Sequence, residues 1–522
     1  MNSVWKKLLC TALSVALLLS VSGSALSAVA KMEQTVPVIL VPGFGGTAVY
    51  NNYGTEEQNA VGDPLPEDQE EHDAAQRAVL ADLALMLTVP GAPMDKEGLI
   101  NDLSRLVKTM TMNLSKNCKS MHKCGYNKYP KSIDHYPEIF LNEDGEEIPV
   151  EERSGEQAYL TQLGESIGYE NVYFFQYDYR KDAADSADQL NRYIQNVRKL
   201  SGSSKVSLLS DSEGCVVVAN YMDLHMDEDL VDHCVFVDGA FAGVSATSLF
   251  GGFLHMDAIQ TSKFLMTLGD AILDDDIAMI LKLGVLLLSY NIGTLTYNVN
   301  SITSDPELCE QLYLKVFKPL MKNVAIFYEF IPYEDFTDAT RYLRKIGFIS
   351  TDDVVYQKIK KYHKVQGRLV ENLKAMKKRG IKTYVIANYG VSGDPVTTGG
   401  DQNQTDVLID TKYASAYATV ADYGKTLDKT RGKYLSPDRV IDASTCALPN
   451  QTWFVRGVIH CTFHYNSDGC KLLTNMVIGK VEPSLRAVQK KYGFSQFVKV
   501  TDHETQSFSD ITSSDAPSGL GI

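Results

Sequence analysis

Short apolar runs bounded by turns recur along the chain and predict buried strands. Several are followed by segments with the helical spacing of apolar residues, of which Ala183–Arg198 is the clearest. Strands that alternate with helices are typical of a mostly parallel sheet with helices on both faces, so we expect an α/β fold. The predicted strands are Val36–Val41, Asn171–Arg180, Val206–Leu209, His233–Asp238 and Ile381–Asn388.

The segment Thr247–Lys378 has a different pattern, with long stretches of helical or near-continuous apolar content. We predict that it forms a helical lid inserted into the α/β domain. Its apolar residues, for example Phe264–Met266 and Ile277–Leu288, exceed what a solvent-facing insertion needs. We therefore expect some of them to pack against the core and the rest to line a cleft. The predicted organisation is a signal peptide (1–30), a catalytic domain (31–246 and 379–505), the lid (247–378) and a disordered tail (506–522).

The run Lys205–Met222 predicts a strand, an abrupt turn of small and acidic residues, and a helix, with Ser212 at the apex of the turn. This is the layout of a nucleophile elbow, whose usual pattern is G-x-S-x-G. Here the pattern is S-D-S-E-G, with Ser210 in place of the first glycine. We predict that Ser212 is the nucleophile. A plain strand-to-helix connection with a capping side chain is the alternative.

A glycine-rich loop, Pro42–Gly46, follows the first predicted strand. Such a loop can direct a backbone N–H at the oxyanion that forms when a serine attacks a carbonyl group. We predict that the N–H of Phe44, with Gly45 next, is one oxyanion donor and that the N–H of Glu213 is the other. A phosphate-binding loop is the alternative, but neither G-x-G-x-x-G nor G-K-[ST] occurs here.

A serine hydroxyl is a poor nucleophile near neutral pH and needs an adjacent base. We predict His460, which follows a short apolar run and completes the chain order Ser…Asp…His. Asp438 is the preferred acid because its D-x-V-I turn and its spacing to the histidine fit. Asp406 is the alternative because it follows the strand Ile381–Asn388 more closely, and Asp442 is the third choice.

Several of these segments resemble the lecithin:cholesterol acyltransferase-like group of α/β-hydrolase lipases. The run Phe175–Arg180, FQYDYR, is similar to the F-x-Y-D-[WY]-R of that group, and it precedes an acid-containing helix and the elbow. The later S-P-D-x-x-I-D-A-S-T and T-W-F segments before His460 resemble bacterial lipase-like proteins. The resemblance covers roughly Val36–Tyr50, Asn171–Gly239 and Ile381–Thr462.

The resemblance implies an α/β-hydrolase fold in which the helical lid lines an acyl-binding cleft beside Ser212. It also implies a serine-dependent carboxylic ester hydrolase of the lipase, esterase or phospholipase kind. The expected substrate is a lipid or another apolar acyl ester, and no cofactor is implied. Other chemistry on the same fold, in an amidase, peptidase or thioesterase, stays open because fold does not fix substrate. A non-catalytic envelope binding protein on a decayed hydrolase fold is the alternative outside enzymes.

Composition and charge are those of a globular protein. The chain has 522 residues, of which 44% are hydrophobic and 22% charged, and a formal net charge of −15. The acidic balance and the lack of a basic stripe argue against nucleic acid as a partner. We expect a small-molecule or lipid ester as the ligand, with interfacial contact with lipid, and the oligomeric state stays open.

The N-terminal residues have the pattern of a secretion signal. Lys6 and Lys7 precede the apolar run Leu8–Val21, and Ala28–Ala30 offers an A-x-A cleavage site. We therefore expect a secreted or cell-envelope protein, with an uncleaved anchor as the alternative.

Cys10 would be removed with the signal, which leaves eight cysteines. Cys118 and Cys124 could close a small disulfide, but pairing does not follow from sequence. No metal site is predicted, because paired C-x-x-C motifs are missing and His122 is an isolated hint.

Overall fold

The structure is a computed structural model that describes residues 35–46, 49–51, 59–60, 69–88, 95–114, 124–125, 130–135, 140, 146–153, 155–264, 289–394, 403–427, 432–465, 467–502 and 507–517. The predicted signal (1–30), the apolar run 277–288 and Cys118 lie outside these residues. None of the helices in this part of the chain combines the length and hydrophobicity that crossing a bilayer requires.

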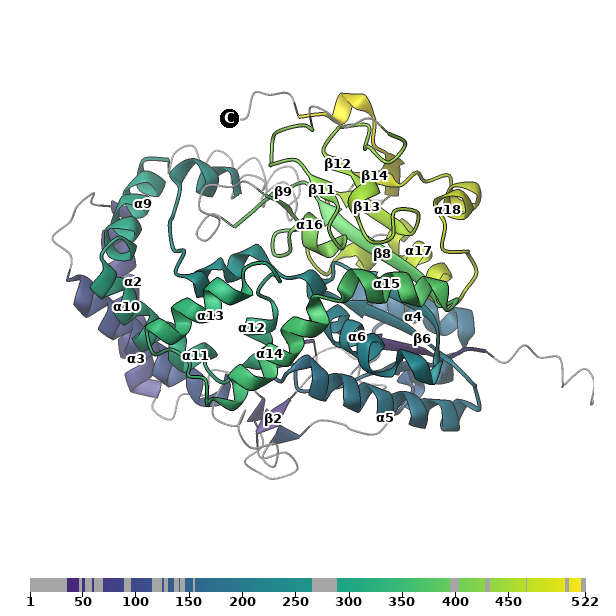
Figure 1. Ribbon diagram of the computed structural model, residues 1–522, viewed down its shortest axis with the longest axis horizontal. Coiled ribbons are helices and arrows are strands. Elements are labelled where there is room, and N and C mark those ends of the chain that lie inside the picture. The colour runs from purple at the N-terminus through teal and green to yellow at the C-terminus, as the bar shows by residue number, and fades with distance from the viewer. Residues whose placement is uncertain are drawn as a thin grey trace, which may run out of the picture. The chain divides into compact units, whose positions relative to one another are not determined.

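An eight-stranded sheet organises the fold (Figure 1). All neighbouring strands in it are parallel except the last pair, β14 and β15. This confirms the predicted α/β class. In spatial order the strands are β15 (Ser507–Asp510), β14 (Phe497–Asp502), β13 (Thr452–Arg456), β8 (Lys382–Tyr389), β7 (Val231–Val237), β6 (Val206–Asp211), β1 (Val38–Val41) and β5 (Val172–Phe174).

Helices cover both faces of the sheet because its side chains alternate between two apolar clusters. Ile39 packs with Val217 on the face that carries α5, α6 and α15. Leu40 packs with Leu160 and Leu472 on the face that carries α4, α17 and α18. These helices are α4 (Gly155–Ile167), α5 (Ala183–Ser201), α6 (Ser212–His225), α15 (Leu369–Lys378), α17 (Ser467–Val477) and α18 (Leu485–Tyr492).

Between β7 and β8 the described chain is helical, as the sequence predicts for this stretch. The helices before α15 are α9 (Ser289–Thr303), α10 (Pro306–Leu312), α11 (Lys318–Met321), α12 (Ala325–Glu329), α13 (Phe336–Lys345) and α14 (Val354–Gln366). The last helix of the predicted lid, α15, packs instead on the sheet, where Leu373 and Met376 join the core cluster. The helical insertion is therefore shorter than 247–378.

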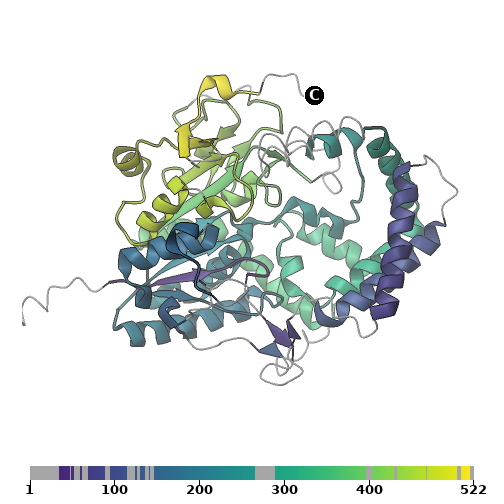
Figure 2. The ribbon, with the colours of Figure 1, turned by 180° about the vertical axis from the view of Figure 1, so that it is seen from behind.

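Two helices from an earlier part of the sequence join this insertion. Helix α2 (Gln69–Thr88) lies beside α9, and α3 (Lys96–Leu114) lies beside α2, α10 and α11 (Figure 2). Ile100 and Val107 of α3 share an apolar cluster with Ile302 and Val316. The assignment of all of 31–246 to the catalytic domain therefore does not hold for α2 and α3.

The C-terminal prediction also needs correction. Residues 507–510 form the edge strand β15, which pairs antiparallel with β14, and Ser513–Asp515 form a short 3₁₀ helix. Phe508 and Ile511 are buried. The predicted disordered tail is therefore wrong for 507–517. Although most residues here are polar, burial of two apolar side chains holds this segment at the edge of the sheet.

Candidate active site

Ser212 lies in a sharp turn at the carboxyl edge of the sheet. Strand β6 ends at Asp211, and α6 begins at Ser212 itself. The Ser212 backbone has a φ of 50°, a left-handed conformation that is uncommon for residues other than glycine. Backbone strain of this kind persists where the surrounding structure holds a functional side chain in place. The strand, turn and helix are the context that an elbow motif requires.

Two flanking residues explain how the motif tolerates a serine at its first position. A Cβ on Gly214 would lie 2.0 Å from the Val41 carbonyl oxygen, so only glycine lets α6 approach β1 this closely. The Ser210 side chain is buried, and its Oγ donates a 3.3 Å hydrogen bond to the Val235 carbonyl oxygen. Its hydroxyl is therefore satisfied within the sheet.

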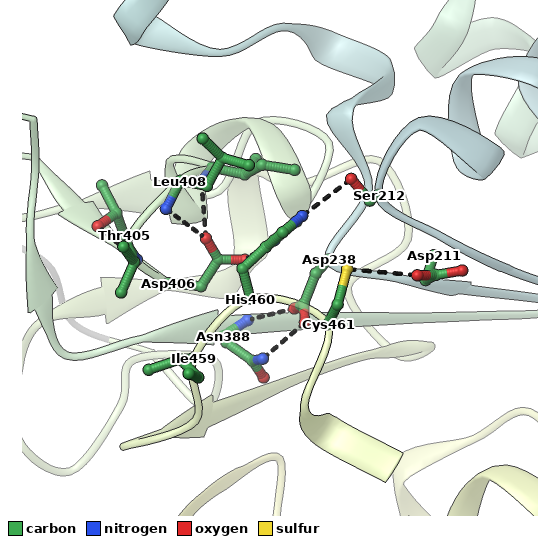
Figure 3. Close-up of polar contacts among 12 residues, drawn as sticks. Asp211, Ser212, Asp238, Asn388, Thr405, Asp406, Leu408, Ile459, His460 and Cys461 are labelled. Carbon is green, nitrogen blue, oxygen red and sulfur yellow. Dashed lines mark hydrogen bonds and ion pairs between the residues drawn. The ribbon is translucent and has the colours of Figure 1, made fainter. Parts of the chain in front are cut away.

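His460 joins Ser212 to Asp406 through its two ring nitrogens (Figure 3). The imidazole Nε2 lies 2.8 Å from Ser212 Oγ, and Nδ1 lies 2.8 Å from Asp406 Oδ2. The three residues follow β6, β8 and β13, whose carboxyl ends meet at one edge of the sheet. A serine whose hydroxyl meets a histidine that is oriented by a carboxylate has the geometry of an activated nucleophile.

The Asp406 carboxylate is fixed from both sides. Its Oδ1 accepts hydrogen bonds from the N–H groups of Leu408 at 3.0 Å and Ile409 at 2.7 Å, which leaves Oδ2 for the imidazole. The His460 backbone N–H also donates to the Asp406 carbonyl oxygen at 2.8 Å. The loops that carry the acid and the histidine are therefore tied together at both backbone and side chain.

The preferred acid of the sequence analysis, Asp438, does not reach the histidine. Its carboxylate is buried and accepts hydrogen bonds from the Tyr389 hydroxyl at 2.9 Å and from Ser436 Oγ, beside Arg456. The D-x-V-I turn is real, but the Asp438 side chain turns inward to hold the loop 436–440. The third choice, Asp442, accepts a 2.9 Å hydrogen bond from the Ser444 N–H as a helix cap. The structure thus brings the alternative, Asp406, to the site.

Asp238 is a second buried acid near the histidine that the sequence analysis missed. It follows β7 with a φ of 46°, and its carboxylate meets the Asn388 N–H at 3.2 Å and Nδ2 at 2.7 Å. Ligand atoms of Asp238, Asp406 and His460 lie within 4.8 Å of one another, a grouping that could hold a metal ion. Burial, with Asp406 nearby, raises the pKa of Asp238 well above its usual range. The sequence signal that could have found it is the position of Asp238 at the end of the predicted buried strand His233–Asp238.

Electrostatics at the histidine favour the imidazolium. Burial alone lowers the pKa of His460, but the neighbouring carboxylates, Asp406 first among them, outweigh it and raise the pKa to about 9. A positive imidazole between two acids is the form that develops when a serine gives up its proton.

The glycine-rich loop lies directly against the nucleophile. A Cβ on Gly43 would lie 2.7 Å from Ser212 Cβ, so a side chain there would displace one of the two. The Gly46 N–H donates to the Gly43 carbonyl oxygen at 3.0 Å and closes a tight turn. The ring of Phe44 packs on Tyr179, with centroids 4.7 Å apart, and on Phe327 of α12 at 5.5 Å. The loop is therefore supported from the segment that follows β5 and from the helical insertion.

Glu213 follows the nucleophile, but its side chain is buried away from solvent. Burial, together with Glu329 and Asp178, raises the pKa of its carboxyl well above the usual range. Tyr177 donates a 2.7 Å hydrogen bond to the Pro42 carbonyl oxygen beside this carboxyl. The side chain is therefore held among buried groups, and the Glu213 backbone N–H belongs to the first turn of α6.

A cavity of about 350 Å³ opens at Ser212 and His460. Its lining comes from the ends of β1, β5, β6 and β7, from α4 and α17, and from the loop after His460. None of the described residues of 247–378 lines it, and most of the residues expected to form the cleft under the lid lie outside the described residues, so that expectation stays a prediction. Glu156, Tyr159 and His464 also line it, and no sequence motif pointed to them.

The cysteines add little to the site. Six of them are free thiols in the described part of the chain: Cys215, Cys234, Cys309, Cys446, Cys461 and Cys470. Cys461, which follows the histidine, donates a 3.3 Å hydrogen bond to Asp211 Oδ2 (Figure 3).

No family model and no curated protein matches the chain. Among solved structures, it is similar to a chain in the crystal structure of the Tle4–Tli4 complex, with 12% sequence identity and a TM-score of 0.32. The match covers 85% of this chain and 98% of that one. A likeness at this level supports no statement about function.

Proposed function

We propose that the protein is a serine-dependent carboxylic ester hydrolase. One observation carries the proposal: Ser212, His460 and Asp406 form a continuous chain of two 2.8 Å hydrogen bonds at an elbow turn. The strained backbone at Ser212 and the tight approach of Gly43 support it, because neither is needed for a plain connection between a strand and a helix. The intact chain of hydrogen bonds also favours an enzyme over a non-catalytic binding protein.

In the proposed mechanism, Ser212 Oγ attacks the ester carbonyl carbon while its proton moves to His460 Nε2. Asp406 keeps the imidazole oriented and stabilises its positive charge. The oxyanion takes hydrogen bonds from the N–H groups of Phe44 and Glu213. The imidazolium then protonates the leaving alcohol, the carbon–oxygen bond breaks, and an acyl-serine remains.

Water completes the cycle. His460 removes a proton from a water molecule, whose oxygen attacks the acyl carbon, and the imidazolium returns that proton to Ser212 as the carboxylic acid leaves. The reaction needs no cofactor. The proposed substrates are lipids or other apolar acyl esters, in line with the resemblance to the lecithin:cholesterol acyltransferase-like group. We also propose a secreted or cell-envelope location, on the signal pattern alone.

Replacement of the nucleophile tests the proposal. Ser212→Ala should lower ester hydrolysis by about 10³-fold or more, as removal of a triad member does. Ser210→Ala is the matched control, because it removes the same hydroxyl two residues earlier from a buried position in the sheet. Retention of more than a tenth of the wild-type rate by purified, folded Ser212→Ala would reject the assignment.

A further inference from the structure

The cavity beside Ser212 has an apolar end that the proposed chemistry does not explain. This end is formed by Leu40, Leu209 and Val237 from the sheet and by Leu160 and Leu473 from α4 and α17, and all five side chains are buried. Natural cores leave few voids of this size, because unfilled apolar space loses contacts on its walls. The space therefore suits an apolar group that enters from outside.

The other end of the cavity contains the reacting groups. Ser212, His460 and the loop residues Gly43 and Phe44 line the same cavity as the five apolar side chains. A group attached to the carbonyl carbon that Ser212 attacks could thus extend directly into the apolar end. Leu408, which is exposed, lies on the wall nearer the solvent.

We propose that this cavity, on the α4 and α17 face of the sheet, binds the acyl chain of the substrate, and that it selects neutral, medium-length acyl esters. The inference rests on the proposed hydrolase function. It moves the acyl site away from the helical insertion: α12 reaches the site through the contact of Phe327 with Phe44, and none of the described insertion residues lines the cavity.

The volume sets the expected length of the chain. At roughly 30 Å³ for each non-hydrogen atom, the share of a water molecule in the liquid, 350 Å³ holds on the order of ten such atoms. An acyl chain of about eight to ten carbons would fill it, and longer chains would have to leave through the mouth.

Acidic side chains in the cavity wall are the reason to expect a neutral acyl chain. Asp211 and Glu156 both line the cavity, and burial raises the pKa of each carboxyl. Among the groups that act on Glu156, Asp211 is a like charge that raises its pKa further. A second carboxylate on the acyl chain would be repelled by these acids on entry and would lose its hydration among the apolar side chains, both at a high cost.

A chain-length series tests the proposal. For p-nitrophenyl esters from acetyl to dodecanoyl, kcat/KM should rise by up to about fourfold for each methylene, the rate equivalent of burying one methylene, and level off near eight to ten carbons. An octanoyl ester that ends in a carboxylate should react at least tenfold more slowly than octanoyl itself. A flat series, or a preference for acetyl, would overturn the proposal.

Matched variants locate the chain. Leu160→Ala enlarges the cavity and should move the plateau to longer acyl groups. Leu163→Ala, one turn along α4, removes the same atoms from an equally buried position that does not line the cavity, and it should keep the wild-type profile. Leu473→Phe should fill part of the cavity and move the plateau to shorter acyl groups. If Leu160→Ala and Leu163→Ala share one profile while both are folded, the acyl chain lies elsewhere.

Two further measurements distinguish the ways in which the acyl-site proposal could fail. If the variants change the dependence on the length of the alcohol in alkyl acetates but not on acyl length, the cavity holds the leaving group and the proposal is wrong. Labelling of Ser212 by a fluorophosphonate reports on the hydrolase function independently of chain length. A labelled protein with a flat series rejects the acyl site alone, whereas an unlabelled and inactive protein rejects both.

Discussion

Asp406 and His460 are joined twice: the imidazole Nδ1 lies 2.8 Å from the carboxylate Oδ2, and the His460 N–H donates to the Asp406 carbonyl oxygen at 2.8 Å. The second bond fixes the start of the histidine loop, and the first fixes the plane and the tautomer of the ring. Together they place Nε2 at the serine without help from Asp438.

The two acids should therefore respond very differently to the same substitution. Asp406→Asn should lower kcat by about 10⁴-fold, because an amide no longer holds the required tautomer. Asp438→Asn should lose far less activity, although it weakens the bonds to Tyr389 and Ser436 and should lower thermal stability. Steady-state kinetics on both variants, with melting curves, would check this, and a larger kinetic loss in Asp438→Asn would contradict the geometry.

Activity should rise with pH. The base must be neutral to accept the serine proton, and the pKa of His460 is raised to about 9, so the competent fraction grows until the pH passes that value. In Asp406→Asn the inflection should move to lower pH, because the carboxylate that opposes deprotonation is gone. A profile of kcat/KM against pH measures both, and a wild-type inflection below 6.5, the ordinary value for histidine, would show that the acids do not act on the ring.

Asp238 should matter much less for the reaction than Asp406. Burial raises the pKa of its carboxyl and so favours the uncharged form, and asparagine is an uncharged side chain of the same shape. Asp238→Asn should keep kcat within about tenfold of wild type, because the group does not meet the Nδ1 atom in the described hydrogen bonds. A loss as large as that of Asp406→Asn, in a folded protein, would mean that both acids orient the ring.

A side chain at Gly43 should impair catalysis without a change in the reacting groups. The new Cβ would lie 2.7 Å from Ser212 Cβ and would push the loop or the nucleophile out of place. Misplacement of this kind can cost about 10²-fold in rate, so kcat/KM of Gly43→Ala should be lower than that of the wild type by that order. Gly432→Ala is the control, because a Cβ there meets no atom within 4 Å. Equal rates for the two variants would show that the loop does not touch the reaction.

The sequence was informative where function depends on local structure. The elbow at Ser212 could be predicted because a strand, small residues and a helix must follow one another directly. His460 could be predicted from chain order. The acid could not be settled, because Asp406 and Asp438 both lie in turns with a similar local pattern, and only the long-range fold decides which carboxylate faces the ring and which faces Tyr389.

Features made by distant segments escaped prediction. The cavity wall comes from α4 and α17, which lie on either side of the elbow in the sequence and have no motif of their own. Helices α2 and α3 look like ordinary surface helices until Ile100 and Val107 are seen against Ile302 and Val316. The apolar content of the insertion predicts that it packs against another part of the protein, but it does not predict which face of the sheet binds an acyl chain.

Covalent labelling tests the central claim most directly. The wild-type protein, incubated with a fluorophosphonate and analysed by intact mass and peptide mapping, should gain one label at Ser212. His460→Ala should label far more slowly, because the serine then lacks its base, and Ser210→Ala should label as the wild type does. Labelling at another residue, or none on folded wild-type protein, would contradict the account that Ser212, His460 and Asp406 form a working catalytic triad.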